Sequence, residues 1–166
     1  MSLFGKKKRA EVQRPVYKGE EINGKAEGIG ELTFPEGDVY KGEFHKGLPS
    51  GQGTFYYETG AVHEGSFSNG RANGPGKYTS ENGIIYEGEF VNDRLQGQGK
   101  ITAPNGSTFE GKFYKDHLNG LGRITYANGD CEEGSFVNGF LHGEGVRRYA
   151  DGTFEKGTFR KGKLMK

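Results

Sequence analysis

The chain has 166 residues, of which 31 are glycine and only 31% are hydrophobic, so it holds too little apolar matter for a conventional closed core. The formal net charge is +1, and no apolar run approaches the length that a membrane-spanning helix requires. A single cysteine, Cys131, excludes an internal disulfide framework and fits a reducing compartment.

Residues 1–16 form a basic arm before the repeats, with five basic residues against one acidic residue. The cluster that could contact an anionic partner is Lys6, Lys7, Lys8 and Arg9. Three interpretations stay open: a solvated tail, a docking arm for an acidic, tubulin-like protein surface, and an anchor on an anionic membrane. The membrane is the least favoured, because Ser2 excludes a myristoylation signal and one basic cluster binds bilayers weakly.

Residues 17–154 hold six copies of a repeat whose period is 23 residues without slippage. Each copy pairs an aromatic-x-Gly-x-Phe segment with a later Gly-x-Gly segment, as in residues 40–44 and 51–53. His63 and Glu132 replace the leading aromatic residue in two copies, and Glu21 replaces phenylalanine in the first. A period in this range is typical of a repeat array.

Apolar and charged residues alternate within each segment, and this pattern predicts strands. Pairs such as Asn82-Gly83 between the copies favour tight turns. We therefore predict an all-β fold: an elongated, single-layer antiparallel sheet of tandem β-hairpins, curved and right-twisted, with its aromatic face inside the curve. Some thirteen strands spaced by about 4.8 Å would give a ribbon of roughly 60 Å.

Glycines inside strands are explained if bulky residues of the neighbouring strand lie over them. The register that we predict on this basis pairs Phe44 with Gly53, Gly42 with Phe55 and Tyr40 with Tyr57.

Residues 155–166 begin a seventh copy that they do not complete, and they carry five basic residues against one acidic residue. We expect Phe154 and Phe159 to lie on an edge strand. Because unpaired edges invite further strands, self-association through this edge is a hypothesis.

The pattern Tyr-x-Gly-x-Phe-x-x-Gly-x-x-x-Gly-x-Gly, seen at residues 40–53, resembles the MORN repeat (membrane occupation and recognition nexus). Asp93 and Asp116 depart from it where other copies have glycine, and Glu132 and Glu155 depart from the leading aromatic residue. The resemblance implies an all-β array that serves as a scaffold, often in cytoskeletal, ciliary or membrane-associated assemblies, and it implies no reaction.

Exposed aromatic strips mark partner sites, so we predict that a peptide or helix of a protein partner binds along the aromatic face. The residues of this predicted strip are Tyr40, Phe44, Phe67, Tyr86, Phe90, Phe109 and Phe113. The function expected is a cytoplasmic, non-enzymatic scaffold in a cytoskeletal or axonemal (ciliary or flagellar) assembly. The alternative is an adaptor that tethers a complex to an anionic membrane through its basic ends.

Other functional classes find little support in the sequence. No helical period follows the Gly-x-Gly pairs, so they do not form phosphate-binding loops, and we predict no catalytic residue and no cofactor. The four histidines fall at four different repeat positions, which gives no metal site, and His63 is expected to be a packed aromatic substitute. Glu64, Glu87 and Glu110 recur at one outward position and predict a solvated charge ladder rather than an acid/base pair. The repeats are net acidic, which opposes nucleic-acid binding.

Overall fold

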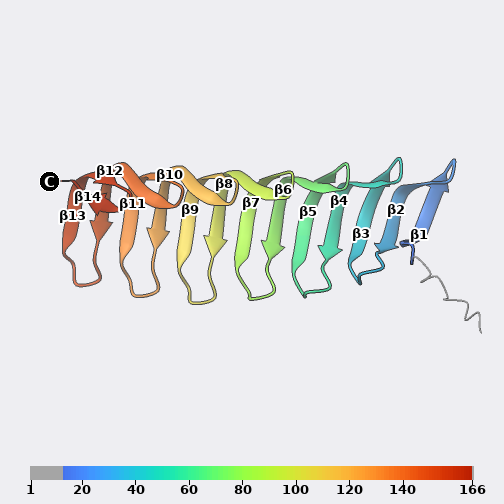
Figure 1. The fold of residues 1–166 in the computed structure, drawn as a ribbon, viewed down its shortest axis with the longest axis horizontal. Coiled ribbons are helices and arrows are strands. Elements are labelled where there is room, and N and C mark those ends of the chain that lie inside the picture. Colours follow the sequence, from blue (N-terminus) through green and yellow to red (C-terminus); the bar gives the residue numbers. More distant parts are fainter. Residues whose placement is uncertain (1–12, 166) are drawn as a thin grey trace, which may run out of the picture.

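The computed structural model describes residues 13–165, which form one open antiparallel sheet of 14 strands in chain order. Strands are the only regular elements in this part of the chain, and they follow one another along an elongated array (Figure 1). The strands are β1 (Val16–Ile22), β2 (Lys25–Thr33), β3 (Val39–His45), β4 (Leu48–Tyr56), β5 (Val62–Ser68), β6 (Arg71–Thr79), β7 (Ile85–Val91), β8 (Arg94–Thr102), β9 (Thr108–Tyr114), β10 (His117–Thr125), β11 (Cys131–Val137), β12 (Phe140–Arg148), β13 (Phe154–Arg160) and β14 (Lys163–Leu164). The predicted all-β array of hairpins is confirmed, with one strand more than the expected thirteen.

Two kinds of turn join the strands. The turns between hairpins are closed by backbone bonds, as from Gly83 N to Ser80 O at 2.9 Å, where the glycine-containing pairs were predicted to reverse the chain. The turns within hairpins place two residues in the left-handed region, as at Lys46 and Gly47 with φ of 51° and 90°. Such two-residue turns match the twist of the flanking strands.

The predicted register is wrong. Gly42 faces Gly53, Tyr40 faces Phe55, and a bulge after Gly42 sets Phe44 opposite Pro49. The reason is the close approach of the two backbones, because a Cβ on Gly42 would lie only 2.5 Å from the Cα of Gly53. Glycine is therefore required on both strands at the same level.

Bulky side chains do lie over these glycine pairs, although not from the positions directly opposite. The ring of Tyr40 covers Gly53, and its hydroxyl donates to the backbone oxygen of Glu43 at 3.1 Å. In later repeats a leucine takes this place: a Cβ on Gly99 would lie 3.0 Å from Leu95 Cδ1. This column of buried leucines was not predicted from the sequence, and it consists of Leu95, Leu118 and Leu141.

The core runs as a line along the aromatic face, with contacts between neighbouring repeats. Tyr40 packs edge-on against Phe44 at 5.2 Å between ring centroids and against Phe67 of the next repeat at 5.0 Å. Cys131 is buried, as expected of an apolar filler. Each repeat thus buries its aromatic residues against the next, as in other solenoid arrays.

The opposite, charged face carries the predicted ladder. Lys100 faces both Glu87 and Glu110 on the neighbouring strands, and its Nζ lies 2.8 Å from Glu110 Oε1. Both side chains of the ion pair are about half exposed, so the pair stabilises the sheet only modestly.

The C-terminal end differs from the expectation that Phe154 and Phe159 lie on an edge strand, because a further strand follows. Strand β14 pairs with the end of β13 and sets Leu164 opposite Phe159, which is buried. Phe154, at the start of β13, is 62% exposed. Within residues 13–165, the outer edge of β13 is therefore covered only toward its end, by β14.

Candidate partner-binding groove

The predicted strip residues divide into two groups. Five of the seven are 0–6% exposed and form the floor of the aromatic face: Tyr40, Phe44, Phe67, Phe90 and Phe113. Tyr86 and Phe109 are only half buried and pack against this floor. A partner can reach the side chains of these two residues directly, whereas the floor residues mainly support the surface.

The central repeats form a pocket on this face, with a volume of about 330 Å³. We call it the acidic aromatic pocket, and it is lined by Tyr57, His63, Tyr78, Tyr86, Phe90, Asp93 and Asp116. The Tyr57 and Tyr78 rings meet at 88° with centroids 6.1 Å apart, and Tyr78 and Tyr86 lie 5.7 Å apart. The rings come from three consecutive repeats and supply one concave aromatic surface, and Asp116 comes from the repeat that follows these three.

Two aspartates stand at the rim of the pocket because they occupy the second position of hairpin turns. Asp93 and Asp116 have φ of 69° and 70°, at the turn position that holds glycine in other repeats. The Oδ1 atom of each accepts a backbone N–H at 2.8 Å, from Ala72 and Leu95 respectively. These bonds fix both carboxylates beside the tyrosines.

The buried groups of the pocket are held in their neutral forms. Burial raises the pKa of Tyr57 to about 12, and the nearby Asp93 carboxylate adds to this shift. Burial also raises the pKa of Tyr86, again with a contribution from Asp116. Burial lowers the pKa of His63 to about 4, against the opposing effect of Asp93. Among the described residues that line the pocket, only the two aspartates carry a negative charge.

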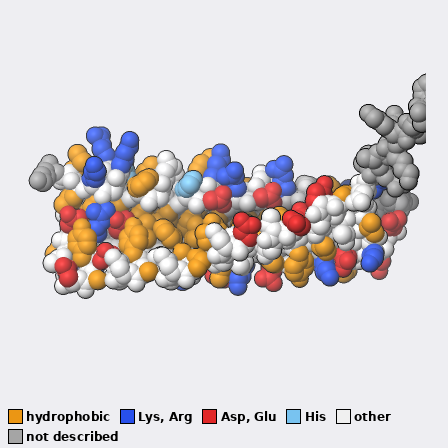
Figure 2. Space-filling view, turned by 60° about the horizontal axis from the view of Figure 1, so that its bottom comes forward, with side chains coloured by type: hydrophobic (Ala, Val, Ile, Leu, Met, Phe, Trp, Pro, Cys, Tyr) orange, Lys and Arg blue, Asp and Glu red, His pale blue; other side chains and the backbone are white. Residues whose placement is uncertain are grey.

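A second pocket of about 350 Å³ adjoins the first and shares Tyr86 and Asp116 with it. We call it the apolar pocket, and its apolar lining is Ile84, Tyr86, Ile101, Ala103, Phe109, Phe113 and Leu118. Figure 2 shows hydrophobic side chains gathered in a band toward the C-terminal end of the array, with acidic side chains beside them near the middle. A polar and an apolar recess thus lie next to each other on a face that no other element of residues 13–165 covers.

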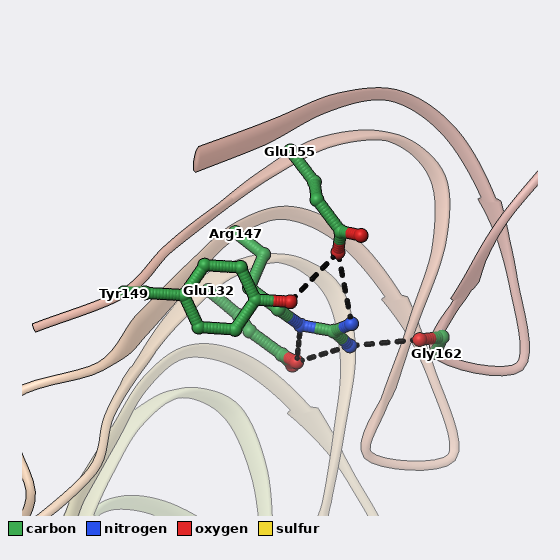
Figure 3. A network of polar contacts seen from close by, with 5 residues as sticks. All are labelled: Glu132, Arg147, Tyr149, Glu155 and Gly162. Atoms are coloured by element: carbon green, nitrogen blue, oxygen red, sulfur yellow. Dashed lines mark hydrogen bonds and ion pairs between the residues drawn. The ribbon is translucent and has the colours of Figure 1, made fainter. Parts of the chain in front are cut away.

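Near the C-terminus a charged network replaces the aromatic contacts (Figure 3). The Arg147 guanidinium lies 2.6 Å from Glu132 Oε1 and 3.3 Å from Glu155 Oε2, and it donates to the Gly162 carbonyl at 2.7 Å. Tyr149 donates its hydroxyl to Glu155 at 2.9 Å. Glu132 and Glu155 stood out in the sequence as departures from the repeat, whereas Arg147 was not predicted; it occupies the repeat position that Phe55 holds in the second copy.

His63 packs among aromatic rings, as expected, with its ring centroid 4.6 Å from that of Phe90. Its Nε2 atom is buried and has no hydrogen-bond partner among the described residues.

The described residues contain no group of His, Cys, Asp or Glu that could hold a metal ion. No helix in residues 13–165 is long and apolar enough to cross a membrane. The predicted basic cluster Lys6, Lys7, Lys8 and Arg9 lies outside the described residues.

Comparison with solved structures finds the same fold in the TCP domain of Drosophila melanogaster SAS-4 (dCPAP), determined in complex with a proline-rich motif of Ana2 (dSTIL). The identity is 22% over 78% of this chain and 71% of that chain, with a TM-score of 0.50. A second structure, the TCP10c domain of Drosophila melanogaster Sas-4, is 21% identical over 79% of each chain, with a TM-score of 0.45. No curated protein sequence matched the chain.

Comparison with family models gives six matches to the MORN repeat, at residues 17–39, 40–62, 63–85, 86–108, 109–131 and 133–154. These matches agree with the repeat that the spacing of aromatic residues and glycines predicted, and they cover most of the chain. The MORN repeat is a non-enzymatic repeat module. The chain therefore belongs to the MORN-repeat family.

Proposed function

We propose that this protein is a non-enzymatic scaffold that binds a segment of a partner protein along its aromatic face. The observation that carries the proposal is the pair of adjoining pockets on a face that no other element covers in residues 13–165. Proteins recognise extended and helical segments in grooves of this kind, where pockets give specificity.

The proposed setting is a cytoskeletal assembly in the cytoplasm, which includes the axoneme of a cilium or flagellum. The solved structure with the same fold supports the binding of a partner segment by analogy, because the SAS-4 TCP domain is in complex with a proline-rich motif of another protein. For our chain the partner would be a filament or axonemal protein that presents such a segment.

The test is a pull-down from a cytoskeleton-rich or ciliated-cell lysate with matched variants, followed by direct binding of the purified candidate. Tyr86→Ala removes a half-buried ring shared by both pockets, whereas Glu87→Ala changes an exposed neighbour on the charged face. We expect identified filament proteins to be lost with Tyr86→Ala and kept with Glu87→Ala. The reverse ranking would move the site to the charged face.

A second candidate function is an adaptor on anionic membranes. The exposed side chains of Arg160, Lys161 and Lys163 favour it, because they cluster at the turn between β13 and β14. Sedimentation with phosphatidylserine vesicles tests this function, using the full chain and a form without residues 1–15. Vesicle binding that disappears with the truncation would make the N-terminal arm the anchor; equal binding of both forms would assign it to the C-terminal end, and no binding would eliminate the adaptor.

Self-association is a further part of the proposal. The outer edge of β13 has no strand partner at its start among the described residues, and Phe154 is exposed there. Unpaired backbone beside an apolar side chain favours the addition of a strand from a second copy. Sedimentation velocity over a concentration series should show association that Phe154→Lys weakens, and a strict monomer at high concentration would rule it out.

A further inference from the structure

The acidic aromatic pocket combines two features that recognise the same kind of group. Three tyrosine rings surround the recess, and two carboxylates stand beside them. Aromatic faces attract cations through their quadrupole, and carboxylates attract them through charge. An anionic ligand would instead meet two negative charges, so the pocket fits a cation.

We propose that the acidic aromatic pocket binds the guanidinium group of an arginine side chain in a partner protein. This inference rests on the proposed function and names the chemistry of the partner segment at the same site. The arginine would stack on the ring of Tyr78 or Tyr86 and donate hydrogen bonds to Asp93 and Asp116.

Arginine fits the pocket better than lysine for geometric reasons. A guanidinium is planar, so it can stack on one ring and still donate in its own plane to carboxylates at the rim. The two aspartates come from turns of successive hairpins, so they approach the recess from different repeats. A lysine ammonium is a compact point charge and cannot make the stacked contact in the same way.

The aspartates retain binding capacity beyond their structural role. Asp93 uses Oδ1 for the backbone N–H of Ala72, and the described residues give no partner for its Oδ2. Asp116 uses Oδ1 for Leu95, and its Oδ2 forms an ion pair of 3.4 Å with the exposed Arg94 side chain, which a partner can displace because such surface pairs are weak. Glycine serves the same turn position in other repeats, as at Gly47 and Gly70, so the fold does not require a carboxylate there.

His63 lines the pocket with its aromatic ring. Its Nε2 atom is turned toward the sheet, because a Cβ on Gly76 would lie only 2.9 Å from it, and it has no hydrogen-bond partner among the described residues. His63 therefore contributes shape and an aromatic surface to the pocket rather than a polar contact.

The adjoining apolar pocket extends the inference to a short sequence motif. The two pockets are centred about one repeat apart, and two strands at about 4.8 Å each give roughly 10 Å. An extended chain covers this distance in about three residues. A segment that runs along the array would therefore carry an arginine and, three residues away, a large apolar residue.

The test uses a synthetic peptide with the sequence acetyl-Gly-Ser-Arg-Gly-Ser-Leu-Gly-Ser-amide and the full chain. NMR titration would follow the tyrosine ring signals and give the dissociation constant. Three further peptides replace arginine by citrulline, lysine or trimethyl-lysine. Citrulline has nearly the same shape without the charge, so we expect it to bind at least tenfold more weakly than arginine.

Matched variants assign the binding to the pocket. Asp93→Asn and Asp116→Asn keep an oxygen for the backbone bond and remove the charge, and each should weaken arginine-peptide binding at least fivefold. Asp130→Asn is the control, because Asp130 also accepts a backbone N–H, from Ala150 at 2.8 Å, but lies outside the pocket. Thermal unfolding of all three variants checks that the fold is intact.

Three outcomes would overturn the inference: equal binding of the citrulline and arginine peptides, tightest binding of trimethyl-lysine, or no shift of the tyrosine signals with any peptide. These outcomes are separable from failure of the scaffold proposal. If a filament protein is lost with Tyr86→Ala but binds fully to Asp93→Asn and Asp116→Asn, the scaffold stands and the arginine pocket falls. If the arginine peptide binds and no cellular partner depends on Tyr86, the pocket stands and the scaffold falls.

Discussion

Glu132 and Arg147 face each other on β11 and β12 and form an ion pair of 2.6 Å, at the two repeat positions that hold Tyr40 and Phe55 in the second copy. Glu132 is only 6% exposed. The pair thus replaces an aromatic contact by two charges of opposite sign. The Glu132 carboxylate depends on Arg147, because a buried charge without a partner loses its hydration without compensation.

Arg147→Leu should lower the free energy of unfolding by about 2–4 kcal/mol, since it leaves the buried Glu132 carboxylate without its partner. Urea unfolding at pH 7 measures this change. The double variant Glu132→Tyr/Arg147→Phe restores the pair of residues seen in the second repeat, and we expect it to recover stability to within about 1 kcal/mol of the wild type. A double variant less stable than Arg147→Leu would show that the charges do more than fill an aromatic site.

The fold was predictable because the 23-residue period appears in glycines and aromatic residues, whose positions indicate turns and strands. The alternation of apolar and charged residues predicted the strands, and the glycine-containing pairs predicted the turns between hairpins. The register was not predictable in the same way, because it depends on how closely two backbones approach at Gly42 and Gly53 and on a bulge that shifts the pairing. The column of Leu95 was hidden since its earlier members are Pro49 and Ala72, so residue identity does not repeat.

The sequence predicted which face of the sheet carries the candidate site, but not which side chains line the pockets. The alternating pattern placed Phe90 and Tyr86 on the same face of the sheet. It could not predict that Phe90 is buried whereas Tyr86 is only half-buried, because this difference depends on packing between repeats. Asp93 and Asp116 were visible as departures from the repeat. That both aspartates line the same pocket as Tyr57 depends on how three different repeats pack together, and the sequence of one repeat does not show this.

Leu95→Ala should destabilise the protein by about 3 kcal/mol, because the side chain is fully buried above a glycine pair and its loss leaves a cavity. Leu121→Ala is the control: Leu121 is 73% exposed, and its loss should change stability by less than about 0.5 kcal/mol. Chemical denaturation of both variants gives the comparison. Similar small losses for the two would mean that the leucine column is not part of the core.

Gly88→Ala should cost about 2 kcal/mol or more, because Gly88 faces Gly99 and a Cβ there would lie 2.7 Å from the Gly99 Cα. The control is Gly106→Ala, at a φ of +88° with open space around the position of the Cβ. That variant should cost only about 1 kcal/mol, from backbone strain alone. Thermal melts compare the two, and an equal loss would show that strain, rather than the close approach of the strands, requires glycine at Gly88.

His63 should make the stability of the protein depend on pH. Burial lowers its pKa from 6.5 to about 4, so between these values the unfolded chain binds a proton that the folded chain does not. The stability that His63 contributes is therefore complete above pH 6.5 and is lost as the pH falls toward 4, by at most about 1.4 kcal/mol per pH unit.

His63→Phe keeps an aromatic ring at this position and removes the titration. Because carboxylates also titrate in this range, the measured quantity is the difference between wild type and His63→Phe in urea unfolding from pH 7.5 to pH 4.5. The wild type should lose stability faster than the variant as the pH falls, and parallel curves would mean that His63 is protonated as easily in the folded protein as in the unfolded chain.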